Sequence, residues 1–133
     1  MPAANYSDLI AWKKAFELAL SIYRVTSHFP IEEKYGITSQ LRRAGISVPS
    51  NIADGHGRNS RGEFRHHLSI AQGSLKEIET QLLIATALRY LGEKQANILM
   101  ARTAEVGRLV NGLSKSLLNR GSIPIQQGPA TNH

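Results

Sequence analysis

The chain has no cysteine, and this absence excludes disulfide bonds, thiolate metal ligands and cysteine nucleophiles at once. Aromatic residues make up only 6% of the chain, and none interleaves with its cationic clusters, so stacking on unpaired bases has little support. No run approaches the roughly 20 apolar residues of a membrane span, and the N-terminal residues lack the pattern of a signal peptide. We therefore expect a cytoplasmic protein with no membrane partner.

Acidic residues are also in the minority. The chain has 16 Lys and Arg against 10 Asp and Glu, which gives a formal net charge of +6. A charge of this sign favours anionic partners such as nucleic acid or an acidic protein surface. Solubility alone is the alternative explanation for it. With 133 residues and 41% hydrophobic content, the chain has the size and composition of one folded domain.

Apolar periodicity predicts four helices. The first, over residues 9–26, carries two neighbouring apolar stripes. One stripe faces the core, while the other meets a second subunit or is covered within the monomer. The second helix runs over about 33–54 and is interrupted at Pro49, where the missing N–H makes the helix kink or restart. The third begins at the capping-box residue Ser60, and the fourth follows a break at Gly92.

The short turn before the fourth helix requires antiparallel packing of the last two helices. The pattern therefore predicts an all-α fold, an up-down-up-down antiparallel four-helix bundle over residues 8–119. Residues 1–7 form an N-terminal extension, and residues 120–133 lack periodicity and form a flexible C-terminal tail. The wide apolar sector of the first helix favours a homo-oligomer.

The densest cationic stretch spans the loop before the third helix and the first turn of that helix. It contains Arg58, Arg61 and Arg65 beside three histidines. Phosphate is the natural ligand of such a cluster, because arginine donates bidentate hydrogen bonds and the first helical turn adds free N–H groups. The alternatives are a solvated corner and an internal pair between Arg58 and Asp54.

Other candidate nucleic-acid-binding residues lie on the second and fourth helices. Arg42 and Arg43 point about 100° apart, so at most one of them shares the patch at the start of the third helix. On the fourth helix Arg108 and Lys115 lie on one face with Arg102 near its edge, which predicts a track for a polynucleotide backbone. A solvent-exposed face is the alternative.

No residue pattern predicts catalysis or a cofactor. Glu63 and His66 have the Glu-x-x-His spacing of di-iron bundles, but no second such pair exists in the chain. Glu77 and Glu79 do not face each other on a helix, so they are not an acid and base pair. No nucleophilic triad order or phosphate-binding glycine loop is present. We expect a protein that is not an enzyme and that holds no metal.

Three blocks of sequence carry a family resemblance. Residues 47–55 read SVPSNIADG, residues 40–44 read QLRRA, and residues 70–79 read IAQGSLKEIE. Together they resemble the small four-helix-bundle proteins first noted as products of 23S rRNA intervening sequences, over residues 6–119. One departure is Asp54, where the family's usual residue is glutamate, so a contact made by that carboxylate has a shorter reach.

The resemblance implies a ring-like homopentamer. It also implies little chemistry, since most members have no assigned activity and the best-understood relatives are accessory proteins of diversity-generating retroelements that bind nucleic acid and a reverse transcriptase. Our leading prediction is a non-enzymatic oligomeric bundle that binds RNA or DNA through repeated basic patches. A protein-interaction scaffold or accessory subunit is the alternative, and a small-ligand or metal-binding ring is a third.

Overall fold

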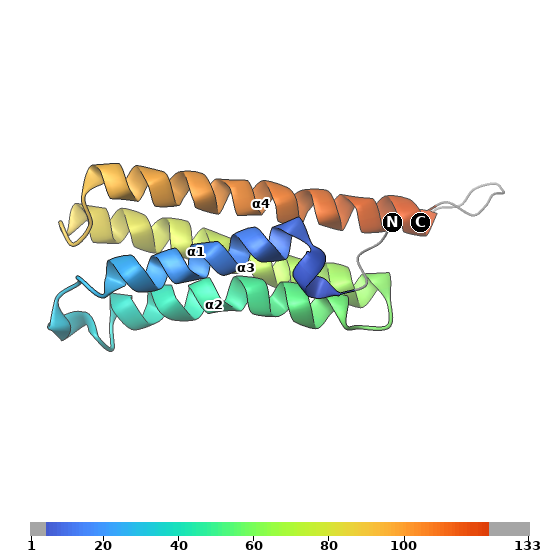
Figure 1. The fold of residues 1–133 in the computed structure, drawn as a ribbon, viewed down its shortest axis with the longest axis horizontal. Helices are drawn as coiled ribbons and strands as arrows, with labels where there is room; N and C mark the ends of the chain where they lie inside the picture. The colour runs from blue at the N-terminus through green and yellow to red at the C-terminus, as the bar shows by residue number, and fades with distance from the viewer. Residues whose placement is uncertain (1–4, 123–133) are drawn as a thin grey trace.

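The structure is a computed structural model, and it describes residues 5–122. The described part is all α, with four long helices, two short 3-10 helices and no strand. These elements are η1 (Tyr6–Asp8), α1 (Ile10–Thr26), η2 (Ile31–Glu33), α2 (Ile37–His56), α3 (Arg61–Ala87) and α4 (Glu93–Ser122). The four helices run alongside one another with alternating direction (Figure 1). Each packs against two others, so the predicted all-α bundle is confirmed.

The predicted start of the second helix, near Glu33, is wrong. Ile31–Glu33 is a 3-10 turn, and α2 begins at Ile37. Glu33 stands before the helix and caps it, because its Oε1 accepts the backbone N–H of Ile37 at 3.2 Å. The Oε2 of the same carboxylate accepts the hydroxyl of Tyr90 at 2.9 Å. This residue therefore joins the α1–α2 connection to the α3–α4 connection.

Pro49 does not interrupt its helix. α2 continues through it from Ile37 to His56, so the helix does not restart there, and a bend at this point stays a prediction. Close to Pro49, the Ser74 hydroxyl of α3 donates to Ser47 Oγ at 2.8 Å, and the Asn51 amide donates to the same oxygen at 3.1 Å. The first of these hydrogen bonds joins α3 to α2 beside the proline, and the second lies within α2.

The ends of the predicted bundle differ slightly from the structure. α4 continues to Ser122, so the first residues of the predicted tail are helical. The rest of that tail, residues 123–133, lies outside the described residues, as do residues 1–4 of the predicted extension. The end of the extension is part of η1, which continues to Asp8 (Tyr6–Asp8).

The core is built from one apolar stripe of each helix. Its largest fully buried residues include Leu18, Ile22, Leu41, Ile52, Leu68, Ile78, Leu82, Leu99, Val106 and Val110. On α1 the core stripe is the one that contains Leu18 and Ile22. The other stripe stays partly outside, with Phe16 45% exposed and Tyr23 39% exposed. The second stripe is therefore covered only in part within the described monomer, since Leu9 and Trp12 pack against the core, and its contact with a second subunit stays a prediction.

Candidate nucleic-acid interface

The corner between α2 and α3 is held by an internal charge cluster. Arg58 donates to both carboxylate oxygens of Asp54, at 3.2 and 3.1 Å, which is the internal pair considered from the sequence. His67 Nε2 lies 2.9 Å from Asp54 Oδ2, and its Nδ1 lies 3.0 Å from the carbonyl oxygen of Glu63. Ser60 Oγ accepts the N–H of Glu63 at 3.1 Å and caps α3. Arg58 therefore has a structural partner, and Asp54 reaches both Arg58 and His67 despite its short side chain.

Replacing Asp54 by asparagine is expected to remove part of the pH dependence of stability. Hydrogen bonds from Arg58 hold the pKa of the Asp54 carboxyl below its ordinary value of 3.8, and the charges of Arg58 and His67 add to this effect against the opposing effect of burial. A carboxyl with a depressed folded-state pKa stabilises the fold above its unfolded pKa, and that contribution is lost as the pH falls through the folded pKa.

The gap in unfolding free energy between the wild type and Asp54→Asn should therefore be wide near neutral pH and narrow in acid. Urea unfolding of both proteins over a pH series from about 6 down to about 2 measures this gap, because the contribution is lost only as the pH falls through the folded-state pKa, which lies below 3.8. A gap of equal size across the whole series would mean that the Asp54 charge does not stabilise the corner.

Arg42 and Arg43 lie in the first half of α2, away from the corner. Arg42 Nε donates to Thr26 Oγ1 at 2.8 Å, and its guanidinium lies over the ring of Tyr23 at 4.5 Å from the centroid. Arg43 donates to Gln40 at 2.9 Å and lies 3.7 Å from a Glu77 carboxylate oxygen. Arg42 joins α2 to α1, Arg43 joins α2 to α3, and neither shares the patch at the start of α3.

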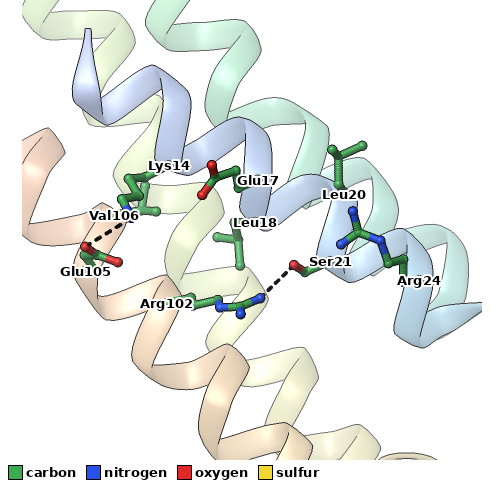
Figure 2. Close-up of a pocket in the computed structure, with 9 residues that line it drawn as sticks. All are labelled: Lys14, Glu17, Leu18, Leu20, Ser21, Arg24, Arg102, Glu105 and Val106. Atoms are coloured by element: carbon green, nitrogen blue, oxygen red, sulfur yellow. Dashed lines mark hydrogen bonds and ion pairs between the residues drawn. The ribbon is translucent and has the colours of Figure 1, made fainter.

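Arg102 is not near the face that holds Arg108 and Lys115. It points into a groove between α1 and α4, where its Nη1 donates to Ser21 Oγ at 2.9 Å (Figure 2). The sequence-based position of Arg102 was wrong, because a spacing of six residues turns it about 120° around α4 from Arg108, toward α1 rather than α3.

A second groove, of about 410 Å³, lies between α3 and α4, which are side by side (Figure 1). The two helices come close here, since Gln72 Nε2 donates to the carbonyl oxygen of Gly107 at 2.9 Å. Both Lys76 of α3 and Arg108 of α4 line this groove. The cations of two different helices therefore meet along one seam.

Helical periodicity extends this seam toward the start of α3. Arg65 precedes Lys76 by 11 residues on α3, and Lys115 follows Arg108 by seven on α4. At about 100° per residue, the two residues of each pair lie within about 20° of each other around their helix. Arg61 lies one turn before Arg65 on that side. Because the helices are antiparallel, the Arg65 end of α3 lies beside the Lys115 end of α4. We call these five residues, Arg61, Arg65, Lys76, Arg108 and Lys115, the basic seam.

The side chains of the basic seam are mostly unengaged. Lys76 lies 3.4 Å from Glu79, which is the acidic residue lining this groove. The other four cations have no hydrogen bond or ion pair with the rest of the described chain, and Arg65 Nε is buried without a partner. Lys76 is the member that the sequence reasoning missed, although its spacing of 11 from Arg65 was visible.

The described residues contain no group of three or more metal-ligating side chains. His66 is exposed, and its neighbour His67 is the one that packs at the corner, with 14% of its side chain accessible. No helix within residues 5–122 is both long and apolar enough to cross a membrane.

Comparison with known proteins finds solved structures of similar fold and a matching family. The fold resembles that of a protein of unknown function from the S23 ribosomal protein family of Bacteroides thetaiotaomicron VPI-5482. The TM-score is 0.75 at 24% identity, over 80% of this chain and 99% of that one. No curated protein matches the chain. Residues 7–112 match the family model of the 23S rRNA-intervening sequence protein, which confirms the resemblance drawn from the sequence. The chain belongs to the 23S rRNA-intervening sequence protein family.

Proposed function

We propose that the protein is a non-enzymatic homo-oligomer that binds the phosphate backbone of nucleic acid along the basic seam. One observation carries this proposal: Lys76 and Arg108, from different helices, line one groove, and Arg65 and Lys115 extend the same row. Glu79 is the acidic residue that lines this groove, so a polyanion meets mainly positive charge there.

The spacing of the seam suits a repeating anion. Arg108 and Lys115 are separated by about 10 Å along the helix axis, at 1.5 Å per residue, and Arg65 lies beside Lys115 on the facing helix. Arginine and lysine in such a row contact phosphates without reading the bases. The seam contains no aromatic side chain for base stacking, so we expect binding that depends on salt and little on sequence.

Titration of labelled duplex DNA and RNA against the wild-type protein at several salt concentrations tests this function. We expect binding to both polymers at low salt, with an affinity that falls steeply as salt rises, because bound cations release counterions from the polymer. Absence of binding at low salt would contradict the proposal and favour a scaffold that binds another protein.

The assembly is proposed to form through an apolar groove between α1 and α2. This groove, of about 470 Å³, contains the exposed stripe of α1 with Trp12, Phe16 and Tyr23, and Ile46 and Pro49 of α2. Trp12 stacks on Phe16 with 5.1 Å between ring centroids. A contiguous aromatic surface of this kind is typical of a protein interface. In a ring such as the family resemblance implies, the basic seam recurs once per subunit, which multiplies weak phosphate contacts.

Replacing Phe16 by glutamate is expected to reduce the oligomer to a monomer. Phe16 is 45% exposed and lies outside the buried core, so the charge disrupts the groove rather than the fold of the subunit. Mass measurement by light scattering at micromolar concentration follows the change. Leu83→Glu is the matched control, because Leu83 is 60% exposed on α3 and does not line this groove.

A wild-type monomer would refute self-association through the α1–α2 groove. The same groove would then fit an amphipathic helix of a protein partner, which is the scaffold alternative. An unchanged mass for Phe16→Glu would instead place the interface on another surface.

A further inference from the structure

The groove between α1 and α4 has the features of a small-molecule site. Its volume is about 360 Å³, and it is lined by residues of only these two helices. Leu18 and Val106 are almost fully buried and form its apolar floor. Charged side chains stand around this floor from both helices (Figure 2). A volume of this size is at the lower end of the roughly 300–1,000 Å³ found for ligand pockets.

The charges of this groove are divided between its two ends. At one end Lys14 Nζ lies 3.9 Å from Glu105 Oε2, so these two charges offset each other, and Glu17 adds a negative charge. The other end has Arg24 and Arg102. The end with the two arginines therefore has a net positive charge, while the other end has a net negative charge from one carboxylate.

Ser21 gives the cationic end a buried polar group. It is 6% exposed and accepts a hydrogen bond from Arg102 Nη1 at 2.9 Å. Its own hydroxyl proton is donated to no atom of the described residues, and Arg102 uses one of its five N–H donors in this bond. Arg24 is exposed and forms no side-chain hydrogen bond or ion pair within residues 5–122. Ser21, Arg24 and Arg102 therefore all have hydrogen-bond donors without an acceptor among the described residues, and all three line the cationic end of the groove.

We propose that the α1–α4 groove binds a small phosphate monoester, with the phosphate between Arg102, Arg24 and the Ser21 hydroxyl. Two arginines and a hydroxyl are the groups that recognise a dianionic oxyanion. The negative charge of Glu17 at the other end repels a continuing polyanion, so the rest of the ligand is uncharged or cationic. This site is independent of the basic seam, which lies on the opposite side of α4.

Isothermal titration with ribose 5-phosphate and with inorganic phosphate tests the site on the full chain. We expect saturable binding, tighter for the monoester than for the free anion, and a dissociation constant about 10-fold higher in Arg102→Gln. Arg24→Gln is the second variant, since no contact within the described residues depends on it, and it should weaken binding in the same direction. Lys94→Gln removes one positive charge from the first turn of α4, outside this groove and outside the basic seam, and should leave the affinity unchanged.

Three results would overturn the proposal. One is that neither ribose 5-phosphate nor inorganic phosphate gives a heat of binding at millimolar concentration. The second is equal weakening by Arg102→Gln and Lys94→Gln, which would show general attraction to a cationic protein. The third is an unchanged affinity in both Arg24→Gln and Arg102→Gln. Failure of nucleic acid to bind would leave these outcomes untouched, so the two proposals fail separately.

Discussion

Replacement of Gly55 by alanine is expected to lower the free energy of unfolding by about 2 kcal/mol, although alanine is the better helix former. Gly55 is buried in α2 where this helix meets α3. A Cβ atom there would lie 2.8 Å from His67 Cβ and 2.9 Å from Phe64 Cδ1, and 3.3 Å from the Phe64 carbonyl oxygen. Because these atoms belong to the backbone, to the first carbon of a side chain and to a buried aromatic ring, α2 and α3 must move apart.

The cost of that movement exceeds the helical gain. Overpacking typically costs about 1–3 kcal/mol, occasionally more, while the exchange of glycine for alanine returns at most about 1 kcal/mol in a helix interior. Separation of the helices would also strain the contact of His67 with Asp54, which is 2.9 Å long. Loss of packing and loss of the corner act in the same direction.

Chemical denaturation of Gly55→Ala beside Gly73→Ala measures this effect. Gly73 lies inside α3 with nothing within 4 Å of its would-be Cβ, so alanine there should raise stability by about 0.5–1 kcal/mol. The two variants have the same chemistry and opposite expected signs. Equal stability of Gly55→Ala and the wild type would show that the α2–α3 contact tolerates a methyl group.

The second large effect is expected from the basic seam. Changing Arg65, Arg108 and Lys115 together to glutamine should weaken nucleic-acid binding by about 100-fold, at roughly 1 kcal/mol for each lost phosphate contact. None of the three forms an ion pair within the described residues, so the fold should remain. Fluorescence anisotropy with a labelled duplex at fixed low salt gives the affinities, and the melting temperature checks the fold.

The matched control removes three charges elsewhere. Lys13, Lys34 and Lys94 are exposed and lie off the seam, so their joint change to glutamine lowers the net charge equally. We expect only a small loss of affinity in this variant. An equal loss of affinity in the two triple variants would show that binding depends on net charge and not on the basic seam.

Much of the fold follows from the sequence because apolar periodicity and capping are local. The spacing of Leu68, Leu75 and Leu82 marks the buried stripe of α3, and Ser60 marks its first turn. The start of α2 was missed by four residues. The acidic pair before it suits a helix terminus, but Glu33 caps Ile37 from outside the helix.

The two apolar stripes of α1 could not be ranked from sequence. Both repeat at helical spacing, and only packing against the other helices decides that Ala15 and Ile22 face the core while Phe16 does not. A restart of the helix at Pro49, one of the two expected outcomes, was wrong for a related reason, while a kink there stays a prediction. Proline removes one N–H from the helical ladder, but α2 continues through it because its face is packed against α1 and α3.

The candidate site was predicted only in pieces. Spacing placed Arg108 and Lys115 on one face and Arg61 with Arg65 on another helix, but the register between α3 and α4 is not encoded in either helix. That register is set by contacts such as Gln72 to Gly107, which bring the two rows into one seam. Arg58 and Arg102 are not part of the basic seam, because each donates a hydrogen bond to another residue of the subunit, Arg58 to Asp54 and Arg102 to Ser21.

The most direct test of the basic seam is the salt dependence of duplex binding by the wild type and by the seam triple variant. Each phosphate contact contributes about 0.9 to the slope of log affinity against log salt for duplex DNA. Loss of three cations should therefore lower the magnitude of the slope by about 2–3. The same slope in both proteins, or a wild type that does not bind at low salt, would contradict the seam as a nucleic-acid interface.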